Sequence, residues 1–257
     1  MAKLTWDNTG NKMYETGVDR GVLYLSDGSG VAWNGLTSVS IKTENGSNTP
    51  LFYDGEKSFD LVSPGDLGVS LNAFTYPEEF NEYFGLVNYN DGVFIDNQPA
   101  KTFGLSYRTY VGNNLNGSES SYKIHVLYNL TAVEEDTTYE TMSDSTSPIT
   151  FGWSLSSTPV KVAGHRHTSH FIIDSATTSP EVLSIVELAL YGGEFTQPEL
   201  PSPVDLLSHV NIVITDNGNG TWTATGPDYY ITILNTGAFE ITNANAYFIA
   251  STFEPLP

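Results

Sequence analysis

The chain has 257 residues, of which 39% are hydrophobic and 12% aromatic, a composition that argues against intrinsic disorder. Thirty Asp and Glu residues against ten Lys and Arg give a formal net charge of -20, which excludes the basic footprint of a DNA-binding domain. The lack of Cys excludes a disulfide framework and thiolate chemistry, and no apolar run reaches the ~18 residues of a membrane span.

The first third of the chain is predicted to form short strands joined by turns. Val22–Leu25 is a strand candidate, and the Asp27–Gly30 stretch predicts a hairpin turn because Gly tolerates positive φ. Leu36–Glu44 alternates with a period of two, which indicates a half-buried strand. The following stretch, 45–59, exceeds the usual connection length. A long ordered loop is often functional, and contact with another subunit is one such function.

The middle of the chain continues the strand pattern. Asp66–Tyr76 alternates, and Pro77–Gly85 predicts a short helical turn closed by Gly85. Phe103–Val111 and Tyr122–Ala132 form a predicted hairpin, joined by the polar loop at 113–120. Further strands are predicted at 149–155, 159–162 and 168–174.

One clear helix is predicted after these strands. Ser179 is a favourable N-cap, Pro180 suits the first helical position, and Glu181 complements the positive helix end. Apolar residues follow at helical spacing, and Gly192 ends the helix after Tyr191.

A proline-rich stretch then divides the chain. Three prolines within 197–203 favour an extended, semi-rigid spacer. We therefore predict a first domain over 1–196, a linker over 197–203 and a small all-β domain over 204–257. The small domain has no Lys or Arg, and its five predicted strands are 211–215, 222–225, 229–234, 239–241 and 247–250.

Residues that could carry chemistry are few. His165 and His167 share one side of an extended segment, which would suit a metal, but His170 would point to the opposite face. A polar turn entering a strand is the preferred interpretation of this segment. His125 and His209 are distant in sequence.

Two acidic segments also receive structural interpretations. Asp216–Gly220 lacks the ligand spacing of a calcium loop and is typical of a hairpin turn. The acidic run at 134–136 indicates a solvated strand end. The sequence contains no nucleophile elbow, phosphate loop or zinc-binding helix motif, so we expect no cofactor and no enzyme activity.

The stretch from Pro159 to Gly192 resembles the end of the tail-tube domain in major tail proteins of actinobacteriophages. That family has a Gly-x-Arg-x-Thr-Ser-His strand, matched here by Gly164, Arg166, Thr168, Ser169 and His170. The strand runs into a Pro-Glu-x-Leu helix, matched by Pro180, Glu181 and Leu183, which stops at Leu190-Tyr191-Gly192. The segments 33–39 and 76–80 are also similar, and the resemblance covers roughly residues 20–195.

The resemblance implies a mainly β fold, namely a two-sheet β-sandwich or barrel with one flanking α-helix, to which the C-terminal β domain would be added. It implies a structural virion protein, assembled in the host cytoplasm, whose hexameric rings stack into a tail tube that conducts DNA. The implied partners are further copies of the chain, a tape-measure protein and viral DNA in the lumen, and terminator and baseplate proteins, with no membrane.

In that family a long loop reaches the adjacent ring, and the stretch 45–59 is the best match. The candidate contact residues are Asn45, Asn48, Pro50, Phe52, Tyr53, Asp54 and Phe59. Two alternatives stay open from sequence. One is a carbohydrate-binding or adhesin-type β-sandwich, with Trp222 and Tyr229–Tyr230 as candidate glycan contacts, and the other is an enzyme with a site scattered over loops.

Overall fold

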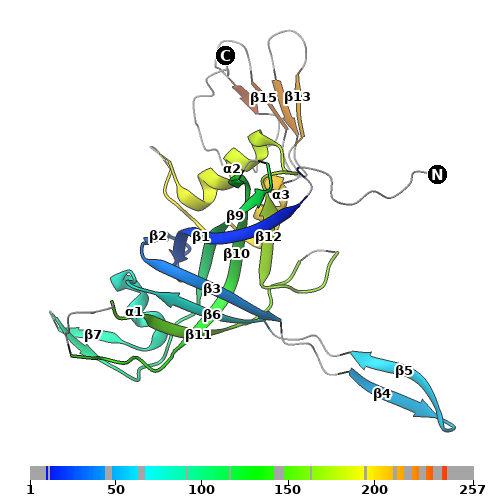
Figure 1. Cartoon of the computed structure of the whole chain (residues 1–257). Helices are drawn as coiled ribbons and strands as arrows, with labels where there is room; N and C mark the ends of the chain where they lie inside the picture. The colour runs from blue at the N-terminus through cyan, green and yellow to red at the C-terminus, as the bar shows by residue number, and fades with distance from the viewer. Residues whose placement is uncertain are drawn as a thin grey trace.

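The chain is described by a computed structural model, and its architecture is mainly β, as predicted (Figure 1). The structure describes residues 10, 12–43, 48–62, 67–90, 92–115, 117–141, 148–162, 164–193, 196–210, 213–216, 222–225, 230–233 and 239–241. None of the described helices is long and apolar enough to span a lipid bilayer.

An eight-stranded antiparallel sheet forms the body of the molecule. Its strands are β1 (Met13–Tyr24), β2 (Gly30–Trp33), β3 (Leu36–Thr43), β6 (Leu67–Ala73), β9 (Phe103–Asn113), β10 (Gly117–Glu134), β11 (Phe151–Ser157) and β12 (His170–Asp174). Their order is β2-β1-β9-β10-β11-β6-β3, with β12 paired to β10 beside that path. The predicted Asp27–Gly30 turn joins β1 to β2, with Gly28 at φ 90°.

The long strand β10 belongs to both halves of the sheet. Its first part pairs with β9 and β12, whereas Leu130–Glu134 pairs with β11. The β9 register shifts between Leu127 and Leu130, and Asn129 at this point has a φ of 50°. A bulge of this kind bends a strand and increases its twist. The two predicted sheets are therefore two halves of one curved sheet.

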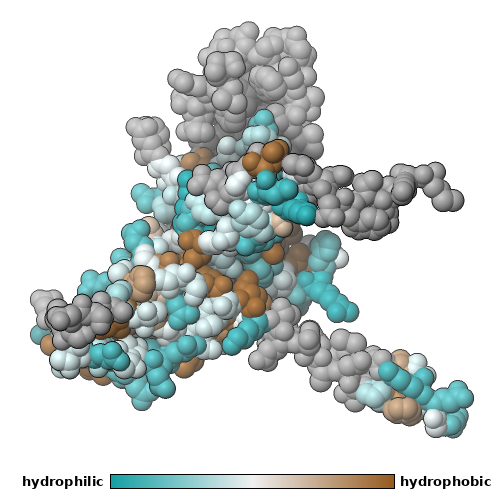
Figure 2. All heavy atoms as spheres, viewed as in Figure 1, coloured by the Kyte–Doolittle hydropathy of each residue, from teal (hydrophilic) through white to brown (hydrophobic). Residues whose placement is uncertain are grey.

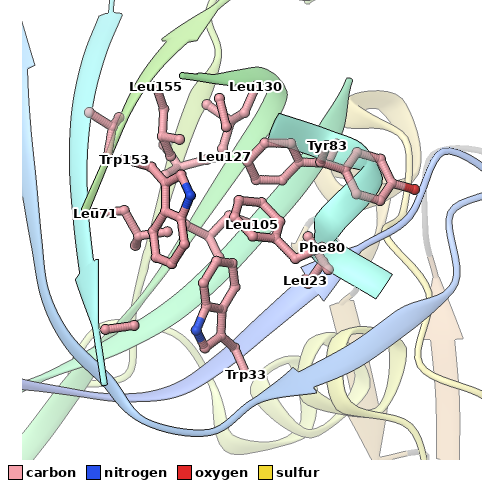
Figure 3. Packing of buried hydrophobic residues seen from close by; sticks show 14 of the residues in the cluster. Leu23, Trp33, Leu71, Phe80, Tyr83, Leu105, Leu127, Leu130, Trp153 and Leu155 are labelled. Carbon is pink, nitrogen blue, oxygen red and sulfur yellow. The ribbon is translucent and has the colours of Figure 1, made fainter. Parts of the chain in front are cut away.

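One hydrophobic core lies inside the curve of the sheet. Trp153 is fully buried and packs edge-on against Phe80 and Trp33, with ring centroids 5.2 Å and 5.8 Å away (Figure 3). Phe80 belongs to the 3-10 turn η1 (Glu78–Phe80), which continues into α1 (Asn81–Phe84). Gly85 closes α1 at φ 96°, as the sequence predicts. Each such buried side chain contributes about 1.5–3 kcal/mol.

A second core forms where two helices pack on the sheet. The predicted helix is α2 (Pro180–Tyr191), and the Ser179 hydroxyl accepts a hydrogen bond from the Val182 amide. An unpredicted helix, α3 (Pro203–Val210), lies against α2 and buries Leu206 to 1% exposure. Residues 204–210 were expected to begin the small β domain, but they include most of helix α3, whose packing against α2 buries Leu206.

The proline-rich stretch is extended and bound along the body. The Gly30 amide donates to the Pro198 carbonyl at 2.8 Å, and the Leu200 amide donates to the Gly28 carbonyl at 2.9 Å. The Tyr128 hydroxyl donates to the Pro201 carbonyl. This stretch therefore joins the β1–β2 turn to α3, and the division of the chain into domains at 197–203 stays a prediction.

Three smaller sheets complete the described chain. Two are hairpins, β4 (Asn48–Tyr53) with β5 (Glu56–Val62) and β7 (Val87–Asn90) with β8 (Val93–Ile95). The third is a four-stranded meander of β13 (Val213–Asp216), β14 (Trp222–Thr225), β15 (Tyr230–Ile233) and β16 (Phe239–Ile241). The fifth strand predicted for this region, 247–250, lies outside the described residues.

Candidate functional site

The stretch expected to be a long loop forms the β4–β5 hairpin. Asp54 and Gly55 connect its strands at φ values of 51° and 84°. Positive φ at both central residues is the geometry of a type I′ turn, which Asp-Gly favours and whose twist matches the flanking strands. The Asp-Gly pair is the signal from which the hairpin could have been predicted.

The β4–β5 hairpin projects away from the rest of the described chain (Figures 1 and 2). Its strands pair only with each other among the described elements. Phe52, Tyr53 and Phe59 are 61%, 62% and 50% exposed, and the Tyr53 and Phe59 rings lie 5.9 Å apart. An isolated two-stranded hairpin is marginally stable in water. Its aromatic side chains therefore form a surface that would gain stability if another molecule covered it.

Most of the predicted contact residues lie on this hairpin. Pro50, Phe52, Tyr53, Asp54 and Phe59 are exposed there, and Asn48 is the first residue of β4. Asn45 lies outside the described residues. Contact of these residues with an adjacent ring stays a prediction.

A hydrogen-bonded polar cluster crosses four strands of the large sheet. On β1 and β9, the Thr109 hydroxyl donates to Glu15 at 2.6 Å, and Lys123 of β10 donates to the other oxygen of Glu15 at 2.7 Å. His125 Nε2 lies 3.1 Å from the Thr109 oxygen, and His125 Nδ1 lies 3.0 Å from His170 Nε2 on β12.

The hydrogen bonds fix the tautomers of both histidines. Because the single Thr109 hydroxyl proton points to Glu15, the Thr109 oxygen accepts from His125 Nε2–H. A neutral His125 then has a bare Nδ1, which accepts from His170 Nε2–H. The ring of His125 is also stacked on Tyr107, with centroids 4.7 Å apart.

Burial keeps both imidazoles neutral. Burial, together with a smaller effect of the neighbouring His125, lowers the pKa of His170 to about 4. Burial also lowers the pKa of His125, although the Glu15 carboxylate opposes this. For Glu15, burial raises the pKa, but hydrogen bonds from Lys123 and Thr109 outweigh it, and the pKa is lowered. The cluster thus holds one carboxylate, one ammonium and two neutral rings.

A second polar cluster lies on the opposite face of β9 and β10, because its residues alternate along these strands with those of the first cluster. Asp19 accepts two hydrogen bonds from the Arg108 guanidinium, at 2.8 Å and 2.6 Å, and a third from the Tyr110 hydroxyl. Burial alone would raise the pKa of Asp19, yet these hydrogen bonds lower it. The Arg108 guanidinium also lies over the Tyr122 ring at 4.7 Å, so this cluster fixes the register of β1, β9 and β10.

The histidines expected to share one side do not meet. His165 and His167 are exposed on the loop before β12, whereas His170 pairs with His125, which lies 45 residues earlier. No sequence motif marks that pairing. Within the described ranges, no group of three or more His, Asp and Glu side chains is placed to hold a metal ion.

The remaining sequence candidates occupy strand ends and turns. The acidic run at 134–136 is exposed at the end of β10. Asp216 ends β13, and the rest of the supposed calcium loop lies outside the described residues. Of the candidate glycan contacts, Trp222 begins β14 and Tyr230 begins β15, while Tyr229 lies outside the described residues.

Comparisons with known proteins return no match among protein-family models and none among curated proteins. Solved structures give weak likenesses. A sheath/tube terminator of the PVC extracellular contractile injection system is 10% identical with a TM-score of 0.32, over 62% of this chain and 97% of that chain. A chain of the PVC sheath-tube complex is 12% identical with a TM-score of 0.30, over 60% of this chain and 88% of that chain. The tube-terminating cap of the anti-feeding prophage is 10% identical with a TM-score of 0.31, over 68% of this chain and 97% of that chain. At these TM-scores the likenesses carry no argument about this chain.

Proposed function

We propose that this chain is a structural subunit of a phage-type tail, and that its copies form rings that stack into the tail tube. The projecting β4–β5 hairpin is the observation that carries the proposal. Within the tube, the hairpin of one copy contacts a copy in the adjacent ring. Six copies surround a lumen that holds a tape-measure protein and conducts viral DNA during ejection, and terminator and baseplate proteins complete the ends.

The energetics of the hairpin support an assembly role. Phe52, Tyr53 and Phe59 leave at least half of their accessible surface in water. Fully burying an aromatic side chain contributes about 1.5–3 kcal/mol, so covering the exposed half of each contributes roughly half of that. Assembly is therefore stabilised by this free energy at each contact, whereas in the monomer the same side chains stay in water.

The open sheet supports the same role. Strands β3 and β12 each have one side without a strand partner among the described elements. Exposed strand edges favour pairing with another chain, and closing a sheet between subunits removes them. The net charge of -20 also suits a conduit, because an acidic wall repels the phosphate backbone of DNA.

Electron microscopy of the purified protein at high concentration tests the proposal. We expect rings or hollow tubes from the wild-type chain. The double variant Phe52→Ser, Phe59→Ser should fold normally but fail to stack, because it removes apolar surface without touching the body. The variant Glu56→Gln, on the same hairpin, is the matched control and should assemble like the wild type.

Two outcomes would overturn the proposal. One is a wild-type chain that stays monomeric even when seeded with a tail initiator complex. The other is a double variant that forms tubes as readily as the wild type. A monomer that binds glycans on an array would instead favour a carbohydrate-binding module.

A further inference from the structure

One segment of this acidic chain carries positive charge and no acidic residue. Although the chain has thirty Asp and Glu residues, the sequence from Ser145 to Ile173 has none. The same segment contains Lys161 and Arg166, together with His165 and His167. These four residues lie in the loop between β11 and β12, which we call the cationic loop (161–167).

The described residues of the cationic loop, 161–162 and 164–167, are anchored at the base of the loop. Val160 and Thr168 pair at its base through two backbone hydrogen bonds of 2.9 Å and 3.1 Å, and Val162 is buried. Lys161 and Arg166 are exposed, and neither has an ion pair among the described residues. By contrast, other cations of the sheet are satisfied, since Arg108 binds Asp19 and Lys123 binds Glu15.

An exposed acidic strip lies at the opposite end of β11. It consists of Glu134, Glu135 and Asp136 at the end of β10, followed by Glu140. Glu134 pairs with Trp153 near the start of β11, whereas the cationic loop follows the end of β11. A seven-residue strand is about 20 Å long. Figure 1 shows the loop on the side of the β4–β5 hairpin and the start of β11 on the side of β7.

This separation determines whether the two charged patches can pair within one copy or only between copies. The cationic loop and the acidic strip are too far apart to neutralise each other within one copy. They are complementary if copies are arranged head to tail, with the loop of one beside the strip of the next. A head-to-tail contact uses two different patches, so it repeats from copy to copy and generates rings or filaments.

We propose that Lys161 and Arg166 of one copy bind the carboxylates of the acidic strip on a second copy. This inference rests on the proposed tail-tube function and names the surfaces that join neighbouring subunits. Exposed ion pairs contribute little affinity, so the contact orients and steers the acidic subunits while apolar contacts hold them. Assembly should therefore weaken as salt screens the pairs.

Reciprocal charge reversal tests the contact. One variant carries Lys161→Glu and Arg166→Glu, and the other carries Glu134→Lys and Glu135→Lys. Each variant alone should need about tenfold more protein to assemble at low salt, because like charges then face each other. An equimolar mixture should assemble like the wild type, because each copy finds its complement in the other variant. Recovery in the mixture also establishes that both variants fold.

Disulfide trapping separates this inference from the proposed function. The chain has no Cys, so a mixture of Arg166→Cys and Asp136→Cys forms intermolecular crosslinks only through the introduced thiols. We expect a crosslinked dimer that disappears at high salt, whereas Arg166→Cys with Ser184→Cys on α2 should give little product. Equal yields from the two mixtures would overturn the head-to-tail contact even if the wild type forms tubes. Specific crosslinking in a chain that forms no rings or tubes, even when seeded with a tail initiator complex, would keep the contact and refute the tail-tube function.

Discussion

Acidification should destabilise the fold through the contact between His125 and His170. Both rings are neutral in the folded chain, and each gains a proton more readily when the chain unfolds. Protonating His125 would place an N–H on Nδ1, directly opposite His170 Nε2–H at 3.0 Å. Two donors facing each other cannot hydrogen-bond, so β12 would lose a side-chain contact with β10.

The direction and size of this loss of stability follow from the pKa of His170, which is lowered from its ordinary value of 6.5 to about 4 in the folded chain. A histidine with a lowered folded pKa contributes stability that is present above its ordinary pKa and lost as the pH falls towards the folded value. Each pH unit of this gap is worth about 1.36 kcal/mol, which sets an upper bound of about 3 kcal/mol. Because His170 is partly exposed and only partly titrated by about pH 5, we expect about 1 kcal/mol there.

Urea unfolding from about pH 7.5 to about pH 5 measures this effect at a protein concentration that keeps the chain monomeric. Replacing His170 with Gln removes the titrating group, so His170→Gln should lose about 1 kcal/mol less than the wild type over this range. The variant His167→Gln changes an exposed histidine and should keep the wild-type pH dependence. Equal losses of stability in His170→Gln and the wild type would contradict this contribution of His170.

Two further substitutions test the packing of the described chain. Leu206→Ala should cost about 2–4 kcal/mol because the side chain is buried, whereas Val204→Ala on the same helix is exposed and should cost under about 0.5 kcal/mol. Equal effects in urea unfolding would contradict the packing of α3 against α2. Asp19→Asn should cost about 2–3 kcal/mol because it leaves Arg108 partly buried without its carboxylate, while Glu56→Gln on the exposed hairpin should be neutral. A neutral Asp19→Asn would refute a structural role for that ion pair.

Local sequence pattern was sufficient to predict most strands of the large sheet and the helix α2. Period-two alternation predicts Leu67–Ala73, and the Ser179 cap with Pro180 and Gly192 predicts the bounds of α2. These signals depend on neighbouring residues, so they can be read without knowing the rest of the fold. The hairpin at 48–62 could have been predicted from the same kind of local signal, because Asp54-Gly55 prefers the type of turn that the structure adopts.

The mainly β class, the principal helix and the strong acidity can all be recognised from the residues alone. The three-dimensional fold was needed to see that β10 bends at Asn129 to join both halves of the sheet, that Leu206 packs into a core, and that His125 contacts His170 across 45 residues. The physical reason is that alternation states which face of a strand is buried but not which strand lies beside it. Strand order and register, which are set by packing of the whole chain, bring distant side chains together.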